Sequence, residues 1–193
     1  IDKASSADII ELMLNDDRKV LAAVQREKPR IAIGADIIVE ALRKSGRVIF
    51  VGAGTSGRLG VVESAEMPTT FGTDPESIQA VMAGGKNAFL HTKEGAEDSY
   101  EDGARAIARL KPTKKDVVVG VSASGMTPYV RGGLTPARKA GSKIIFVTCD
   151  PRTELQTFVD LTIAPAVGPE VIAGSTRLKA GTASSPTASR PAP

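Results

Sequence analysis

Five short apolar runs, separated by stretches with helical spacing, constrain the fold of this chain more than any other feature. The runs predict β-strands at Arg47 to Val51, Ile78 to Met82, Asp116 to Val121, Lys143 to Thr148 and Leu161 to Ala164. The stretches between them predict helices at Arg58 to Glu66, Glu97 to Leu110 and Pro128 to Ala140. Strands that alternate with helices are typical of a parallel α/β sheet, whose ligands bind at the carboxyl ends of the strands.

The first 45 residues predict three helices that precede the sheet and pack on it. The first runs from Ala7 to Leu14 after a Ser5-Ser6 N-cap, the second from Asp16 or Asp17 to about Lys28, and the third from Pro29 to Gly46. At the other end, residues 183–193 are rich in Pro and Ser and have no apolar face. We therefore expect a single domain over residues 1–182, followed by a disordered tail.

Composition argues against several classes of partner. Aromatic residues make up 4% of the chain and Trp is absent, so side chains on which nucleic-acid bases could stack are few. The net charge of +3 is accounted for by Arg177, Lys179 and Arg190, which leaves the body of the chain neutral. No apolar run approaches the roughly 20 residues of a membrane span. We expect neither a nucleic acid nor a membrane as partner.

The chain has a single cysteine, Cys149, and a single histidine, His91. One cysteine cannot form an internal disulfide, and no cluster of cysteine and histidine suggests zinc or another metal. A single cysteine with no possible internal disulfide predicts a reducing compartment, the cytoplasm.

The segment V-G-A-G-T-S-G-R, residues 51–58, follows the first predicted strand and has the spacing G-x-G-x-x-G. Its three glycines are Gly52, Gly54 and Gly57. A dinucleotide site would need an acid at the end of the second strand, about 20 residues on, but the nearby Asp74 and Glu76 precede that strand. Thr55 and Ser56 instead place two hydroxyls beside the backbone N–H groups of a helix N-terminus, which suits a phosphate monoester. A tight turn without a ligand is the alternative.

A second segment of the same kind, Ser122-Ala-Ser-Gly-Met-Thr-Pro128, follows the third predicted strand. Pro128 is suited to the first turn of the next helix. Ser and Thr are ordinary turn residues, so this segment alone is weak evidence. Together the two hydroxyl-rich segments predict a pocket for a small phosphorylated polyol.

Acidic residues follow both of the first two strands. Glu63 and Glu66 lie on the helix after the glycine-rich segment, where a solvated helix face is the simpler interpretation. Glu94, Glu97 and Asp98 open the next helical stretch, where acids also stabilise the helix dipole without any catalytic role.

The position of Glu66 raises a geometric difficulty. The helix from Gly57 to Glu66 rises by roughly 13 Å, which exceeds the distance from the phosphate to C3 of a hexose phosphate. Either the helix ends early and Pro68 turns the chain back, or the acid serves the site of a neighbouring subunit.

Five motifs, taken in order, resemble the N-acetylmuramic acid 6-phosphate etherases, which are built on the sugar isomerase (SIS) domain. They are Gly52-Ala-Gly-Thr-Ser-Gly-Arg-Leu-Gly60, Glu66 with Pro68 and Phe71-Gly72, Glu94-Gly-Ala-Glu-Asp98, Ser122-Ala-Ser-Gly with Thr127-Pro-Tyr129, and Gly174-Ser-Thr-Arg-Leu-Lys-Ala-Gly-Thr182. The resemblance implies a three-layer SIS-type sandwich and a homodimer. It also implies a cofactor-free lyase that removes D-lactate from N-acetylmuramic acid 6-phosphate in peptidoglycan recycling.

The resemblance also implies roles for particular residues. The two catalytic glutamates of the family fall on Glu66, expected as the acid at the lactate oxygen, and on Glu97, expected as the base. The residues implied to bind the substrate are Gly54, Thr55, Ser56, Gly57, Ser122, Ser124, Gly125 and Thr127, with Ser175, Thr176 and Lys179 closing the pocket.

Two of the departures from the family bear on the expected activity. Met126 replaces an arginine that often follows Ser-Ala-Ser-Gly, which removes a cation near the phosphate. After Ala183 the family continues through a helical region, so the Pro-rich tail and the start at Ile1 lead us to expect a truncated or frame-shifted fragment. Three other functions remain as hypotheses: a non-catalytic sugar-phosphate regulator, an aldose-ketose isomerase and a nicotinamide-dependent oxidoreductase.

Overall fold

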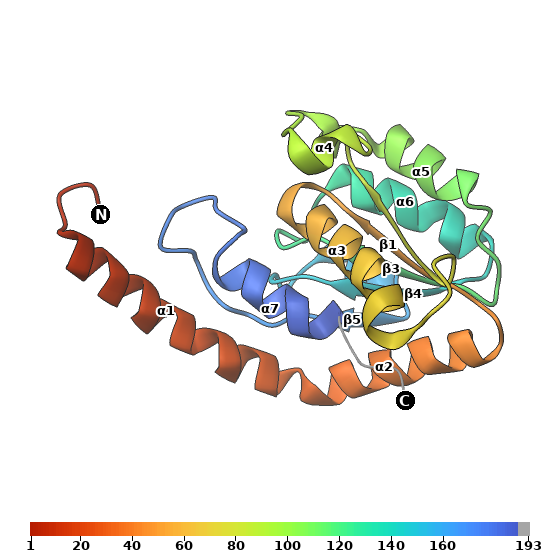
Figure 1. The fold of residues 1–193 in the computed structure, drawn as a ribbon, viewed down its shortest axis with the longest axis horizontal. Coiled ribbons are helices and arrows are strands. Elements are labelled where there is room, and N and C mark those ends of the chain that lie inside the picture. Colours follow the sequence, from red (N-terminus) through yellow and green to blue (C-terminus); the bar gives the residue numbers. More distant parts are fainter. Residues whose placement is uncertain (189–193) are drawn as a thin grey trace.

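A five-stranded parallel sheet forms the centre of the computed structural model, which describes residues 1–188 (Figure 1). Its strands are β1 (Val48–Gly52), β2 (Ile78–Met82), β3 (Val117–Val121), β4 (Lys143–Val147) and β5 (Leu161–Ile163). They lie in the order β2-β1-β3-β4-β5, and each neighbouring pair is parallel. All five strands predicted from the apolar runs are confirmed, with small differences at their ends.

Helices cover both faces of the sheet, which confirms the three-layer architecture. The flanking helices are α2 (Lys28–Arg43), α3 (Gly54–Phe71), α5 (Tyr100–Arg109) and α6 (Pro128–Lys139). Successive side chains of a strand point to opposite faces. Ile49 therefore packs with Ile107 and Leu134 under α5 and α6, whereas Phe50 packs with Met67 of α3 on the other side.

The N-terminal region differs from the prediction, because one long helix replaces two. Helix α1 runs from Ser6 to Arg26 without a break, and Ser5 caps it as expected, accepting a hydrogen bond from the Asp8 N–H. Pro29 lies in the first turn of α2, as predicted. The first half of α1 extends away from the sheet and exposes apolar side chains (Figure 1), whereas Val20 and Ala23 are buried.

The chain between β2 and α5 was predicted incompletely. A short helix, α4 (Asn87–Leu90), and a 3₁₀ helix, η1 (Ala96–Asp98), precede α5, and a second 3₁₀ helix, η2 (Glu154–Thr157), precedes β5. Helix α5 begins at Tyr100 rather than at Glu97, because Ser99 caps it by accepting from the Asp102 N–H. Glu97 and Asp98 therefore lie outside the first turn of α5, so stabilisation of that helix does not explain them.

The C-terminal segment contains a helix where a disordered tail was expected from residue 183. Helix α7 runs from Lys179 to Ala188, and Ala183 is fully buried. The Glu170 carboxylate accepts hydrogen bonds from the backbone N–H groups of Lys179 and Ala180, so it caps this helix. Residues 189–193, the rest of the expected tail, lie outside the described residues.

Two glycines allow α5 and α6 to pack in backbone contact. A Cβ added to Gly132 would lie 1.9 Å from the Tyr100 carbonyl oxygen, and one added to Gly103 would lie 1.9 Å from the Tyr129 carbonyl oxygen. These neighbours are backbone atoms, so they cannot move aside without separating the helices.

We therefore expect Gly132→Ala to lower the free energy of unfolding by about 3 kcal/mol or more, measured by urea denaturation. Gly34→Ala is the control, because the closest atoms to its Cβ would be the side-chain ends of Ile163 and Leu161, at 3.2 and 3.3 Å. Alanine also has the higher helix propensity, so this control should be close to neutral. If the two variants lost the same free energy of unfolding, this would contradict backbone contact between α5 and α6 as the cause.

Candidate functional site

The sheet order creates a site at its carboxyl edge. In a doubly wound sheet of order 2-1-3-4-5 the strand order reverses between β1 and β3, and ligands bind where the carboxyl ends of those strands meet. Gly52 and Val121 are register partners at these ends. The segments that follow them are residues 53–57, which are Ala53 and the first turn of α3 (called the first loop here), and residues 122–127 (the second loop); the two are therefore adjacent.

The first loop depends on close contact between helix α3 and strand β1. A Cβ on Gly52 would lie 2.7 Å from the Gly57 nitrogen, and a Cβ on Gly57 would lie 2.8 Å from the Met82 Cβ. Glycine at both positions lets the N-terminus of α3 begin directly at the sheet edge. Ala53, which precedes the helix, has no side-chain oxygen to cap the first-turn N–H groups, so this helix end is suited to an anion.

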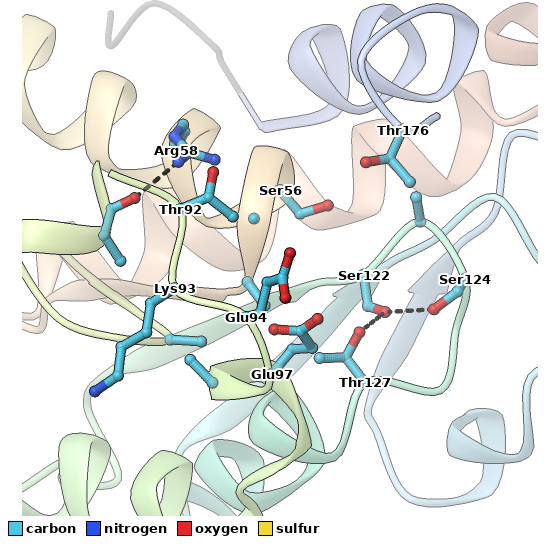
Figure 2. Close-up of a pocket in the computed structure, with 16 residues that line it drawn as sticks. Ser56, Arg58, Thr92, Lys93, Glu94, Glu97, Ser122, Ser124, Thr127 and Thr176 are labelled. Carbon is cyan, nitrogen blue, oxygen red and sulfur yellow. Dashed lines mark hydrogen bonds between the residues drawn. The ribbon is translucent and has the colours of Figure 1, made fainter. Parts of the chain in front are cut away.

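The second loop gathers three hydroxyls. The Ser122 Oγ lies 2.7 Å from the Thr127 Oγ1 and 3.4 Å from the Ser124 Oγ (Figure 2). Gly125 makes the turn with φ of +76°, and its carbonyl oxygen accepts a hydrogen bond of 2.9 Å from Thr153. The hydroxyls are thus held at the N-terminus of α6, where the dipole also favours an anion.

A cavity of about 210 Å³ lies between the two loops. Its lining comes from the first loop (Ala53, Gly54 and Ser56), from the second (Ser122, Ala123, Ser124 and Thr127), and from Arg58, Ala83, Ala88, Thr92, Lys93, Glu94, Ala96, Glu97 and Thr176. Seven residues predicted for the site line it: Gly54, Ser56, Glu97, Ser122, Ser124, Thr127 and Thr176. The rest of the predicted set, Thr55, Gly57, Glu66, Gly125, Ser175 and Lys179, is not part of this lining.

Lys179 is the clearest difference from the expected pocket. Its side chain is 1% exposed, and its ammonium group lies 2.7 Å from the Asp16 carboxylate of α1. Lys179 is absent from the cavity lining, and its ammonium group is instead held by this buried ion pair.

Two carboxylates enter the cavity from one segment. Glu97 lies in η1, and Glu94 lies one short turn earlier; Figure 2 shows both carboxylates projecting into the space in front of the second loop. In the sequence, Glu94 belongs to an acidic cluster at a predicted helix start and to the third family motif, but no role of its own is predicted for it. The sequence carried no signal that separates it from Asp98, which is absent from the lining.

Arg58 was also missed, and it holds this acidic segment in position. Its guanidinium donates hydrogen bonds of 2.9 Å to the Phe89 carbonyl and 2.8 Å to the Ala88 carbonyl at the end of α4. Arg58 belongs to the first turns of α3, so the helix that forms the first loop also anchors the chain that leads to Glu94 and Glu97.

Glu66 lies on the surface of α3, away from the cavity of its own chain. The helix continues through Pro68 to Phe71, so the early end considered from the sequence is wrong. Glu63, one turn earlier, is half-buried, and burial followed by the charge of Glu66 raises the pKa of its carboxyl.

Within residues 1–188, no helix combines the length and apolarity needed to cross a membrane. The same residues contain no group of three or more histidine, cysteine, aspartate or glutamate side chains arranged to hold a metal ion.

A parallel sheet of this strand order, with a site suited to an anion at its switch point, defines the class of this protein as a doubly wound α/β domain. More specifically, residues 30–138 match the family described as Glucokinase regulatory protein N-terminal SIS domain, so the chain belongs to the SIS-domain family.

Curated relatives confirm the resemblance drawn from the motifs. The chain is 52% identical over 184 residues to an N-acetylmuramic acid 6-phosphate etherase of Salinibacter ruber, covering 95% of this chain and 59% of the relative. It is 50% identical over 184 residues to one of Symbiobacterium thermophilum, covering 95% of this chain and 61% of the relative. The chain thus spans about 60% of the length of these relatives.

Solved structures confirm the fold. A phosphoheptose isomerase of Neisseria gonorrhoeae aligns with a TM-score of 0.70 at 16% identity, over 94% of this chain and 93% of that one. A phosphoheptose isomerase of Francisella tularensis aligns with a TM-score of 0.67 at 19% identity, over 84% and 86% of the two chains.

Because the pKa of Glu63 is raised, we predict that replacing Glu63 by a neutral side chain stabilises the protein, and that this effect depends on pH. The folded chain holds this proton more tightly than a carboxyl with the ordinary pKa of 4.5, so ionisation of Glu63 opposes folding as the pH rises through the folded pKa. Glu63→Gln should therefore raise the Tm by a few degrees at most at pH 7, with a smaller gain at pH 4. Glu66→Gln, the control, relieves only the repulsion and should give less. A gain larger at pH 4 than at pH 7 would contradict this assignment.

Proposed function

We propose that this protein is a lyase that cleaves the D-lactyl ether of N-acetylmuramic acid 6-phosphate, giving N-acetylglucosamine 6-phosphate and D-lactate. The observation that carries the proposal is the Glu97 carboxylate, which faces a cavity bounded by two hydroxyl-lined loops. The names of the relatives at 45–52% identity support the substrate and the reaction. An SIS-type neighbour in complex with ManNAc-6P supports a phosphorylated amino sugar as the class of ligand.

The phosphate of the substrate would occupy the two loops. The hydroxyls of Ser56, Ser122 and Thr127 line the same cavity, and the N-termini of α3 and α6 add backbone N–H donors beside them. Three predicted residues are not part of the cavity lining: Thr55, Gly57 and Gly125. We propose that they contribute by setting the backbone conformation of the loops. The sugar then extends from the phosphate toward Glu94 and Glu97.

The chemistry requires a base and an acid. In the open-chain sugar the C1 aldehyde acidifies the C2 proton, and the Glu97 carboxylate removes it. The C3–O bond then breaks as a carboxylic acid protonates the lactate oxygen, which leaves a C2–C3 double bond conjugated with the aldehyde. Water adds to this bond, its oxygen to C3 and a proton to C2, and completes the product.

The acid is assigned to Glu66 of a partner subunit. Glu66 is exposed and lies outside the cavity of its own chain, one helical turn after the exposed Val62. This face of α3, together with the exposed apolar side chains of α1, supplies surface for a homodimer in which each copy completes the site of the other. Glu94 of the same chain is the competing candidate for the acid.

We further propose that the protein acts in the cytoplasm, in the recycling of peptidoglycan. The substrate is a phosphorylated sugar, and the single cysteine is half-buried and cannot serve an internal disulfide.

The activity is tested by incubating the purified chain with N-acetylmuramic acid 6-phosphate and assaying D-lactate. Glu97→Gln should lower kcat by about 10²–10⁴-fold, the usual contribution of a general base, without unfolding the chain. Asp98→Asn is the matched control, an exposed acid on the next residue, and should stay within about twofold of wild type. A substrate-induced rise in Tm without lactate would favour the non-catalytic regulator, and a ketose product would favour an isomerase.

The shared site predicts complementation between two inactive variants. Glu66→Gln and Glu97→Gln chains, mixed under conditions that exchange subunits, form mixed dimers in which one of the two sites has both carboxylates. Random pairing gives half mixed dimers, so about a quarter of wild-type activity should return. If the acid is Glu94, Glu94→Gln is inactive and no mixture with Glu97→Gln regains activity. A Glu66→Gln chain with full activity would overturn the role of Glu66.

A further inference from the structure

A buried ion pair joins the N-terminal helix to the start of the last helix. The Lys179 ammonium lies 2.7 Å from the Asp16 carboxylate and donates a second hydrogen bond of 2.7 Å to the Pro169 carbonyl. Asp16 is 8% exposed, and its other carboxylate oxygen accepts from the exposed Lys19 at 2.7 Å. The two charged groups are 163 positions apart in the sequence (179 − 16) and satisfy one another inside the protein.

The ion pair is close in sequence to a wall of the cavity. Lys179 follows the segment 175–178, and Thr176 of that segment lines the cavity. The backbone of this segment rests on α7, because the Thr176 carbonyl oxygen lies 3.2 Å from the position of a Cβ on Gly181. The Thr55 methyl group approaches the same position at 3.9 Å, so the start of α7 also touches the first loop.

Apolar packing continues the contact between α1 and α7 beyond the ion pair. Val20 and Ala23, the next buried positions of α1, pack with Ala180 and Ala183 of α7. Cys149, at the end of β4, packs against the same cluster. Helix α1 therefore lies alongside α7 over this stretch, as Figure 1 shows, while its first turns extend beyond it.

We infer that Asp16 is a positioning residue for the binding of the phosphorylated sugar. By holding Lys179, it fixes the segment that presents Thr176 to the phosphate loops. This inference rests on the proposed function for its ligand. It assigns a role in the site to a helix that contributes no residue to the cavity lining.

The physical basis is the restriction that a buried charge imposes. An ammonium group inside the protein needs an anionic partner, so α7 can dock only where Lys179 meets Asp16. Small apolar side chains such as Ala180 and Ala183 could pack against α1 at several positions along the helix. The ion pair can form at only one position, so it fixes the register of α7 against α1. Loss of the Asp16 charge leaves the buried ammonium of Lys179, within the described part of the chain, with neutral acceptors and no anionic partner, which favours movement of segment 175–178 away from the loops.

The test compares Asp16→Asn with Asp17→Asn, a matched loss of one carboxylate on the exposed neighbouring residue. Calorimetric titration with N-acetylglucosamine 6-phosphate should give a Kd at least about 10-fold weaker for Asp16→Asn, with the Asp17→Asn value near wild type. In the lactate assay KM should rise by a similar factor while kcat stays within about threefold, since Glu97 is untouched. Asp16→Glu, which keeps the charge, should recover part of the affinity. A Kd for Asp16→Asn equal to that for Asp17→Asn would overturn the inference.

Cys149 provides a readout that does not depend on the function. Burial, and then the nearby Glu170 carboxylate, raise the pKa of its thiol to about 11, so alkylation at pH 8 should be slow while α7 is docked. Asp16→Asn should increase the alkylation rate by about 10-fold or more, because opening of the α1–α7 cluster exposes the thiol. Equal rates in the Asp16 and Asp17 variants would overturn the inference, whereas a wild-type chain that binds no sugar phosphate would contradict only the proposed function.

If Asp16→Asn does not fold, the double variant Asp16→Leu with Lys179→Met replaces it, because removal of both charged groups leaves no unpaired charge inside the protein. This variant should fold and still bind N-acetylglucosamine 6-phosphate about 10-fold more weakly than wild type. Wild-type affinity in the folded double variant would overturn the positioning role.

Discussion

The close approach of helix α3 to strand β1 is the constraint on which the rest of the site depends. Glycine at positions 52 and 57 lets the helix begin at the sheet edge, within contact of Met82 on the neighbouring strand. The helix N-terminus is thereby fixed beside the second loop, because β1 and β3 are parallel and end in register. Arg58, in the first turns of α3, then holds the chain that leads to Glu97 by hydrogen bonds to two backbone carbonyls of α4.

Two kinds of polar side chain, hydroxyls and carboxylates, line the resulting cavity. One side offers neutral donors, the hydroxyls of both loops, and the other offers the carboxylates of Glu94 and Glu97. Met126, 78% exposed on the second loop, supplies no cation, and Arg58 commits two of its donors to backbone carbonyls. Lys93 belongs to the cavity lining, but Figure 2 shows its side chain extending away from the hydroxyls of the second loop. Under the proposed function, phosphate binding would therefore depend mainly on hydroxyls and helix N-termini, and so on the geometry of the loops.

That geometry depends on parts of the chain distant in sequence. Asp16 pairs with Lys179 at the start of α7, and Glu27, at the junction of α1 and α2, accepts a hydrogen bond of 3.1 Å from the Ala164 N–H just after β5. Two buried carboxylates thus tie the N-terminal helices to the start of α7 and to the end of β5. Burial of such groups demands specific partners, so these contacts fix the docking of the outer helices more narrowly than apolar packing would.

The strands, the parallel sheet and the two loops were predictable from the sequence, because apolar runs, glycine spacing and hydroxyl residues are local signals. Five motifs in order also indicated the family. The sequence did not separate Glu94 from Asp98, assign a role to Arg58, or reveal that Lys179 is buried against Asp16. These points came from the folded structure, which also places Glu66 outside the cavity lining of its own chain. They could not be predicted because the partners of a side chain depend on how distant helices dock, and no local pattern encodes that docking.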